Sequence, residues 1–282
     1  MTPRSRRHDH DAGGDPELLA AKAALRDEVW AALTEARVAR FPGARNRISN
    51  FTGAEAAARR LAGTDTWQAA ATIKANPDSA QLPVRQRALE DGKTVYMAVP
   101  RLAEEAPFFL LDPDDLDDTP RKASSIKGAS RSGRTVAVSD LEPVDLVVTG
   151  CVAVAEDGAR LGKGGGFSDL EFAVASQAGL VAPDTPVVTT VHEQQIVVRG
   201  EIPVTDHDVR LDLIVTADRV VTCTREPATP AASTGTSSPR RRSRPSRCWD
   251  ACAARDEESR CSGRVGSCRW AERAPRLSRG VS

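Results

Sequence analysis

Residues 145–151 read DLVVTGC and residues 160–169 read RLGKGGGFSD, and these two stretches decide the fold. The first is an apolar, β-branched run of the kind that forms a strand buried on both faces of a sheet. The second is rich in glycine and leads into a predicted helix from about Ser168 to Gln177, closed by Gly179. A strand followed by a glycine-rich loop and a helix is typical of an α/β domain.

The glycine-rich loop has the composition of a phosphate-binding loop. Without Cβ atoms its backbone N–H groups can approach phosphate oxygens closely, and the N-terminus of the next helix adds a positive dipole end. Arg160 and Lys163 add full charges, and Asp169 can hold a metal that bridges the phosphates. The loop is not a Walker A motif, since Lys-Ser/Thr does not follow its last glycine, and it is not a good Rossmann fingerprint. The alternative is a flexible glycine linker, which its position between a strand and a helix disfavours.

Strand and helix patterns alternate on both sides of this loop. Helices are predicted to start at Asp15-Pro16-Glu17, at Thr52 with Glu55 completing a capping box, and at Gln81, with the last one running to Asp91 before Gly92. Strands are predicted over Thr72–Ala75, Thr94–Val99, Pro107–Leu111 and Pro186–Val191, and as a hairpin of Leu211–Val215 with Arg219–Thr222. The alternation predicts a three-layer α/β/α sandwich with a mainly parallel sheet.

Two changes of composition divide the chain. Residues 1–15 are polar and charged, which predicts a disordered leader, and residues 16–225 form the α/β domain. Over residues 226–282 Arg, Ser, Pro, Ala and Cys dominate and periodicity disappears, which predicts a basic, disordered tail. A second hypothesis is a frameshift after about Arg225. One shifted frame of a permitted back-translation of residues 230–246 reads GGIDWDELTPEKIAAI, which contains a helix start and an apolar period.

The overall composition argues against several classes of protein. The 39 basic and 39 acidic residues give a formal net charge of zero, which argues against a general nucleic-acid binder. No apolar run approaches the roughly 20 residues that cross a bilayer, and the N-terminus lacks the apolar segment of a secretory signal. Of six cysteines only Cys151 and Cys223 lie in the patterned part, and those in the tail lack the C-x₂-C pairs of a structural zinc site. We therefore expect a cytoplasmic protein without a membrane segment, and the sequence leaves its oligomeric state open.

The glycine-rich loop resembles the Arg-Leu-Gly-x-Gly-x-Gly-Tyr-Tyr-Asp loop of 5-formyltetrahydrofolate cyclo-ligases. Three more segments are similar in the same order: Ala21–Arg26 to the family's Lys-x-x-Leu-Arg element, Gly92–Val95 through Pro100-Arg101 to its Gly-Lys strand ending in Pro-Arg, and Pro203–Thr216 to its Pro-Val-x-x-x-Asp-Val-x-x-Asp-x-Ile-Val-Thr ending. The resemblance spans roughly Pro16 to Thr224, and it implies a three-layer α/β sandwich.

The resemblance also implies an ATP- and Mg²⁺-dependent enzyme that acts on a reduced folate, 5-formyltetrahydrofolate. It implies catalytic roles at the phosphates for Lys22, Arg160 and Lys163. Contacts to ATP are implied for Lys22 and Arg26 and for the run Arg160, Leu161, Gly162, Lys163, Gly164, Gly165, Gly166, Phe167 and Ser168. Asp169 and Asp208 would hold Mg²⁺, and Asp78 would contact the folate. On the residues alone, Lys22 and Arg26 also fit a solvated helix face, and Asp78 beside Pro77 fits a turn.

Several positions depart from the family's pattern. Phe167-Ser168 stand where the family has Tyr-Tyr, and Gly165 stands where it usually has a basic residue. Asp78 and Gln81 stand where the folate pocket has Glu followed three residues later by Thr. The segments Ala75–Ser79 and Tyr96–Leu102 resemble more closely the family's cyclo-ligase-like branch. The alternative function is therefore a nucleotide-binding protein of this fold that acts on another small molecule, such as a thiamine-related one, or that lacks catalysis.

Two histidines lie beside acidic residues, and each fits more than one role. His207 lies between two aspartates and fits either a metal or acid/base cluster or a capped loop. His192 beside Glu193 fits the surface or the wall of a pocket. A non-catalytic nucleotide- or RNA-binding protein would need a basic patch, which the balanced charge does not favour.

Overall fold

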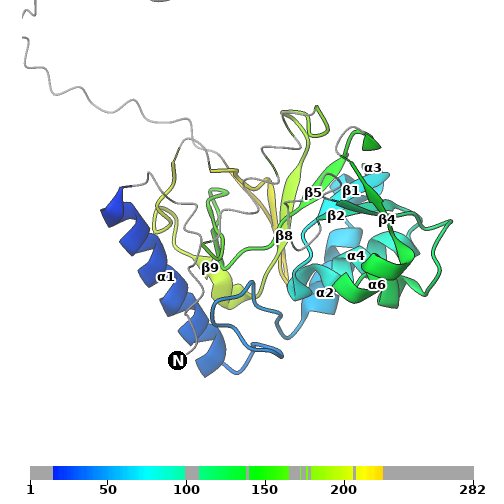
Figure 1. Ribbon diagram of the computed structural model, residues 1–282. Coiled ribbons are helices and arrows are strands. Elements are labelled where there is room, and N and C mark those ends of the chain that lie inside the picture. The colour runs from blue at the N-terminus through cyan, green and yellow to red at the C-terminus, as the bar shows by residue number, and fades with distance from the viewer. Residues whose placement is uncertain are drawn as a thin grey trace, which may run out of the picture. The chain divides into compact units, whose positions relative to one another are not determined.

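The structure is a computed structural model of the chain, and it describes residues 15–98, 108–137, 140–164, 172, 176, 179–205 and 208–224 (Figure 1). The chain separates into two units, Met1–Thr229 and Pro230–Ser282, and every described residue belongs to the first. In the described part of the chain, none of the helices combines the length and the apolar character that a bilayer crossing requires.

The described residues form one large sheet whose strands lie in the order β11-β10-β8-β5-β1-β2-β3-β4. Neighbours from β10 to β2 pair in parallel, whereas β11 at one edge and β3 and β4 at the other pair antiparallel. The bounds are β1 Thr72–Ala75, β2 Thr94–Ala98, β3 Phe108–Leu111, β4 Arg134–Val136, β5 Leu146–Val148, β8 Val187–Thr190, β10 Leu213–Val215 and β11 Val220–Thr222. The prediction of a mainly parallel sheet is confirmed.

The strands follow the predicted runs closely. β1 has the predicted bounds, and β10 and β11 form the predicted hairpin, with Ile214 opposite Val221. The strand predicted over residues 145–151 is shorter, since β5 spans only Leu146–Val148. The Asp145 carboxylate accepts hydrogen bonds from the backbone N–H groups of Ala71 and Thr72, so that residue caps the strand pair instead of extending β5.

Helices cover one face of the large sheet. They are α2 Ala54–Ala62, α3 Asp65–Ala69, α4 Leu82–Glu90, α5 Pro120–Ala123 and α6 Ile126–Ser132. Side chains alternate across a strand, so Ile73, Val95 and Leu146 all face this layer, where they pack with Leu61 and Val84 in one buried cluster. In Figure 1 α2, α4 and α6 lie together on this side of the sheet.

The other face carries a second, small sheet and then the first helix. Tyr96, Val147 and Ile214 point to this face and pack with Cys151 and Val154. The small sheet has the order β7-β6-β9, with β6 Ala153–Ala155, β7 Arg160–Leu161 and β9 Ile196–Val197. Helix α1, Pro16–Glu35, packs against it and lies on the opposite side of the large sheet from α4 (Figure 1). The predicted sandwich of helices and a mainly parallel sheet is confirmed, with the small sheet as an addition that the sequence analysis missed.

The predicted helix starts have different outcomes. α1 begins at Pro16 as predicted, and the Asp15 carboxylate accepts a hydrogen bond from the backbone N–H of Glu17. The capping box at Thr52 is wrong: α2 begins at Ala54, its N-cap is Gly53 at a φ of +97°, and no side chain caps it. The backbone N–H of Thr52 bonds instead to the carbonyl of Val38, which keeps Thr52 in an extended connection.

Two further helix predictions concern the segments beside the site. The helix expected from Gln81 is preceded by a 3₁₀ turn, η1 Ser79–Gln81, so α4 starts one residue later and ends before Gly92, whose φ is +72°. The helix expected from about Ser168 to Gln177 falls mostly outside the described residues.

Candidate functional site

The candidate site lies where parallel strands of the large sheet end. β1 continues into Asn76–Asp78, β5 into Thr149-Gly150, and β8 into Val191-His192, so these segments share the carboxyl edge of the sheet. From β1 the chain crosses to β2 on one side, whereas from β5 it crosses to β8 on the other. Ligands of open α/β sheets bind at such a switch point, outside the carboxyl ends of the strands. The crevice between β1 and β5 is therefore the expected place for a ligand.

The glycine turn after β7 is in direct contact with α1. The Arg26 guanidinium donates a hydrogen bond from Nε to the carbonyl oxygen of Gly162 at 2.8 Å. A Cβ built on Gly164 would lie 3.2 Å from Cζ and Nη1 of Arg26, and the φ of Gly164 is +94°. A glycine is therefore required at position 164 both by the backbone conformation and by the close approach of the guanidinium.

Lys22, one helical turn before Arg26, reaches the segment after β9 instead of the glycine turn itself. Its ammonium lies 3.1 Å from Oδ2 of Asp208, and both side chains are largely buried. Burial raises the pKa of Asp208, but hydrogen bonds from the Thr205 N–H and from Lys22 outweigh it and hold that pKa below its usual value. Asp208 is thus an ionised carboxylate that already has a cationic partner.

Arg160 and Leu161 point inward from β7. The side chain of Arg160 is only 7% exposed, and its Nε donates to the carbonyl oxygen of Val209 at 3.1 Å. It lines a small cavity with Lys74 and Thr149 on the second face of the large sheet. Leu161 is 1% exposed and packs in the cluster under α1, so it can offer a nucleotide only its backbone.

Asp78 lies between the strand ends and the glycine turn. It is the N-cap residue of η1, yet its side chain makes no capping hydrogen bond there. Instead Oδ1 lies 3.8 Å from Nζ of Lys163, and Oδ2 would lie 3.2 Å from a Cβ on Gly150. The carboxylate therefore lies at the carboxyl ends of β1 and β5, where a ligand is expected, and beside the glycine turn.

Gln81 lies behind Asp78 and is fully buried. Its Nε2 lies 3.5 Å from the carbonyl oxygen of Thr190, and its Oε1 would lie 2.9 Å from a Cβ on Gly150. Among the described residues neither Oε1 of Gln81 nor Oγ1 of Thr190 has a hydrogen-bond partner, and both belong to the same strand ends as Asp78. Buried polar atoms without partners are uncommon. These two make the strand ends a polar environment.

The remaining predicted site residues lie outside the described part of the chain. These are Gly165, Gly166, Phe167, Ser168 and Asp169, together with His207. Within the described ranges there is no group of three or more His, Cys, Asp and Glu side chains that could hold a metal ion. Mg²⁺ commonly binds through one or two protein carboxylates plus phosphate oxygens and water, so Asp208 beside the basic groups fits a metal that is carried by a nucleotide.

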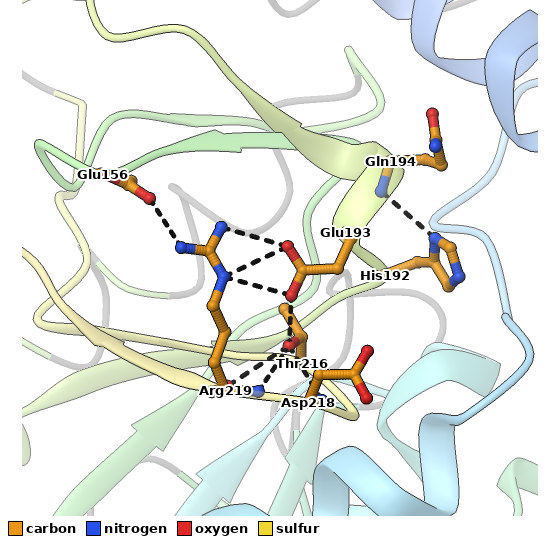
Figure 2. A network of polar contacts seen from close by, with 7 residues as sticks. All are labelled: Glu156, His192, Glu193, Gln194, Thr216, Asp218 and Arg219. Atoms are coloured by element: carbon orange, nitrogen blue, oxygen red, sulfur yellow. Dashed lines mark hydrogen bonds and ion pairs between the residues drawn. The ribbon is translucent and has the colours of Figure 1, made fainter.

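A polar network that the sequence analysis missed follows the carboxyl end of β8 (Figure 2). The Glu193 carboxylate accepts a hydrogen bond from the Thr216 hydroxyl at 2.6 Å and pairs with Arg219, whose Nη1 also reaches Glu156 at 3.1 Å. These contacts connect η3, Glu193–Gln195, with the β10–β11 turn and the β6–β7 turn. The network fastens the small sheet to the edge hairpin of the large one.

His192 takes part in the same region as a structural residue. Its Nδ1 accepts a hydrogen bond from the backbone N–H of Gln194, which caps η3, and its ring packs edge-on against Phe51 at a centroid distance of 6.2 Å. His192 is half-buried, and these contacts give it a structural role at the start of η3.

The profile of the 5-formyltetrahydrofolate cyclo-ligase family matches residues 17–217, which are most of the described unit. The chain belongs to this family. Methenyltetrahydrofolate synthase domain-containing proteins of Bos taurus and Mus musculus are 37% and 39% identical to it over 219 and 204 residues. These alignments cover 77% and 72% of this chain but only 58% and 55% of the relatives, so the chain spans a little over half of their length.

Among solved structures, the 5,10-methenyltetrahydrofolate synthetase of Aquifex aeolicus is similar, with a TM-score of 0.47 and 18% sequence identity. The match covers 76% of this chain and 99% of that one. The resemblance inferred from the glycine-rich loop and its three companion segments is confirmed at the level of the family by the sequence profile.

Proposed function

We propose that the protein catalyses the ATP-dependent conversion of 5-formyltetrahydrofolate to 5,10-methenyltetrahydrofolate, with release of ADP and phosphate. The observation that carries the proposal is the contact of Arg26 with the glycine turn, which brings together residues 136 positions apart in the chain. A guanidinium over a glycine-rich turn with Lys163 beside it is suited to the terminal phosphates of a nucleotide. Membership of the cyclo-ligase family supports the same reaction.

In this reaction the formyl oxygen of the substrate attacks the γ-phosphorus of ATP, and the bond to the leaving ADP oxygen breaks. The formyl oxygen thereby becomes part of a good leaving group. N10 then attacks the formyl carbon, loses its proton, and phosphate departs with the oxygen. Such a transfer needs mainly orientation and neutralisation of charge.

Each side chain then has a role that its position allows. Arg26 and Lys163 neutralise charge on the phosphates at the glycine turn, and Lys22 holds Asp208 beside them. Arg160 acts from beneath the turn, through the segment around Val209. Asp208, with Asp169 from outside the described residues, would hold Mg²⁺, which would neutralise part of the phosphate charge. Asp78, at the crevice, would accept hydrogen bonds from N–H groups of the folate.

The test is turnover by the purified full chain, followed by the absorbance of the methenyl product with ATP and 5-formyltetrahydrofolate. A second version should carry the shifted-frame sequence after about Arg225, because the tail hypothesis predicts a gain from that repair. We expect ATP-dependent product from at least the repaired chain, and loss of product in Arg26→Ala. Absence of the methenyl product from both versions would refute the proposal.

A second candidate keeps the nucleotide site but changes the substrate. It is favoured by the short Asp78 side chain and the buried Gln81, which give the crevice a different shape from the Glu and Thr of the family pattern. The substrate would then be another small molecule, such as a thiamine-related one. A thermal-shift screen with folates and thiamine intermediates, each with and without ATP, separates the candidates by which compound raises the melting temperature.

A further inference from the structure

A single buried arginine holds the backbone of the segment that carries Asp78. Arg85 projects from the first turn of α4, and its side chain is 1% exposed. Its Nη1 donates to the carbonyl oxygens of Asn76 and Asp78, and its Nη2 donates to that of Pro77. One guanidinium therefore binds three consecutive carbonyl groups directly after β1.

The fourth contact anchors the arginine from the opposite side. Nε of Arg85 donates to the carbonyl oxygen of Ser124 at 2.9 Å, at the carboxyl end of α5. Among its hydrogen-bond partners in the described residues there is no carboxylate, so the guanidinium is satisfied by backbone alone. Both ends of the fork are thereby fixed, and the geometry of Asn76–Asp78 follows from the position of α4.

Burial of this charge is unfavourable for stability by itself. Desolvation lowers the pKa of Arg85 to about 10 against the opposing attraction of Asp78, and the group stays protonated at neutral pH. Replacing buried charges with apolar side chains of similar volume is often neutral or stabilising. An arginine is needed here because only its planar fork can reach several carbonyl oxygens at once.

The consequence of the clamp is the direction of the Asp78 side chain. The Asp78 carbonyl accepts hydrogen bonds both from Arg85 and from the backbone N–H of Gln81, so the backbone of Asp78 is used inside the fold. The backbone of Asn76 is tied to β5 as well, through its N–H and the Val148 carbonyl. The Asp78 side chain then extends from a fixed backbone, and its carboxylate lies next to Gly150 and Lys163.

We propose that Arg85 is the positioning residue of the substrate site: by clamping the three carbonyls of Asn76–Asp78 it fixes the Asp78 carboxylate in the crevice between β1 and β5. The inference rests on the proposed function for the identity of the ligand, but not for the clamp itself. Arg85 touches no ligand, and it acts only through Asp78.

The test compares Arg85→Met and Arg85→Lys with Lys93→Met in the full chain. Lys93 is the matched control because it is also a buried cation in the helix-covered half of the fold, with Nζ bonded to the Ala70 carbonyl and 5.6 Å from the Trp67 ring, away from Asp78. Arg85→Met should raise the KM for the folate by on the order of tenfold to a hundredfold, as expected when a contact group is misplaced by about 1 Å. The KM for ATP should change less than about twofold, and Arg85→Lys should recover part of the loss.

Amide hydrogen exchange gives a second measurement that does not depend on turnover. Exchange at residues 76–81 should quicken in both Arg85 variants while the core strands stay protected, and Lys93→Met should leave this segment unchanged. If neither the wild-type chain nor the version with the repaired tail has turnover, the proposed function fails and exchange alone decides the clamp. The inference is overturned by unchanged exchange at residues 76–81 in Arg85→Lys, or by equal rises in the KM values of both substrates. If Arg85→Met does not fold, Arg85→Lys carries both measurements.

Discussion

Two loops meet at the carboxyl edge of the sheet, and the protein holds them in opposite ways. Arg26, on a helix in another layer, donates a hydrogen bond to the carbonyl of Gly162 and lies against Gly164 in the glycine turn Gly162–Gly164. The buried Arg85 donates hydrogen bonds to the three backbone carbonyls of Asn76–Asp78. The Asp78 carboxylate of this segment lies on the side of Lys163. The first arrangement suits a loop that must close on a charged ligand, and the second suits a fixed hydrogen-bonding contact.

The contrast has a consequence for mutants. At the glycine turn, the proposed binding surface is the backbone itself, so a side chain added at Gly164, against the Arg26 guanidinium, interferes directly. At the Asp78 segment, the backbone is occupied by structural bonds, so the contact proposed for the ligand is made by the carboxylate. We therefore expect changes at the turn to affect ATP and changes at Asp78 to affect the folate.

The largest effect is expected at the glycine turn. Gly164→Val should lower kcat/KM for ATP by about a hundredfold or more, since a Cβ would lie 3.2 Å from the Arg26 guanidinium and a φ of +94° is strained for valine. Steady-state kinetics with varied ATP measure it. Gly162→Ala is the matched control, because a Cβ there meets nothing within 4 Å. Equal losses in the two variants would contradict a specific role for the turn's shape.

A smaller and separate effect is expected at Asp78. Asp78→Asn should raise the KM for the folate by about tenfold to a hundredfold, the usual consequence of losing a hydrogen bond to a charged group, with the KM for ATP little changed. Asp78→Glu should keep most of the activity, because the family pattern carries a glutamate at this position. A change in the KM for ATP alone would mean that Asp78 serves the nucleotide and that the two loops do not divide the work.

A variant of Lys163 tests whether this residue, which lies between the two loops, serves ATP or the folate. Its side chain is 45% exposed, and its ammonium lies 3.8 Å from Oδ1 of Asp78, which is too long and too solvated for a strong pair. Lys163→Met should therefore lower kcat/KM for ATP by roughly tenfold and change the KM for the folate by less than about threefold. Lys122→Met, which removes an exposed lysine paired with Asp118, should leave both constants unchanged. A dominant effect on the folate would assign Lys163 to the Asp78 segment.

The elements that local pattern determines could be predicted from the sequence. β1 and the start of α1 follow from a short apolar run and from an aspartate before a proline, and both are found at the predicted residues. Composition alone identifies the glycine turn, and the resemblance to the family adds Lys22 and Arg26. The pairing of those side chains could not be derived from helical spacing, since Lys22 reaches Asp208 whereas Arg26 reaches Gly162.

The features that the sequence analysis missed depend on partners distant in the chain. β6 and β9 are only a few residues long and pair across about 40 positions, so neither has a readable period. Arg85 in the segment Leu82–Glu90 has the spacing of an ordinary basic helix residue, and its burial depends on Ser124 and on the carbonyls after β1. The wrong prediction of a capping box at Thr52 also results from a partner distant in the chain. The backbone N–H of Thr52 donates a hydrogen bond to the carbonyl of Val38.

The smallest effect is expected away from both loops, in the network of Figure 2. Burial raises the pKa of Glu193, but hydrogen bonds from Arg219 and Thr216 outweigh it, so its folded-state pKa lies below the usual value. A carboxylate of this kind stabilises the fold above its unfolded pKa, and the contribution disappears as the pH falls through the folded pKa. Glu193→Gln should therefore lower the free energy of unfolding by about 0.5–1 kcal/mol at neutral pH, a figure reduced for solvent screening.

Urea unfolding followed by circular dichroism measures this difference as a function of pH. The wild type and Glu193→Gln should converge only as the pH falls through the lowered folded-state pKa of Glu193, where the glutamate becomes protonated in the folded state too. Asp118→Asn is the control: Asp118 pairs with Lys122 on the solvated surface, and its removal should lower the urea midpoint less than Glu193→Gln does. Because Glu193 faces the hairpin and the small sheet and not the crevice, both KM values should stay at the wild-type level. A Glu193→Gln variant could instead retain wild-type stability at neutral pH but lose affinity for the folate. Glu193 would then belong to the substrate site, and the two loops alone would not account for ligand binding.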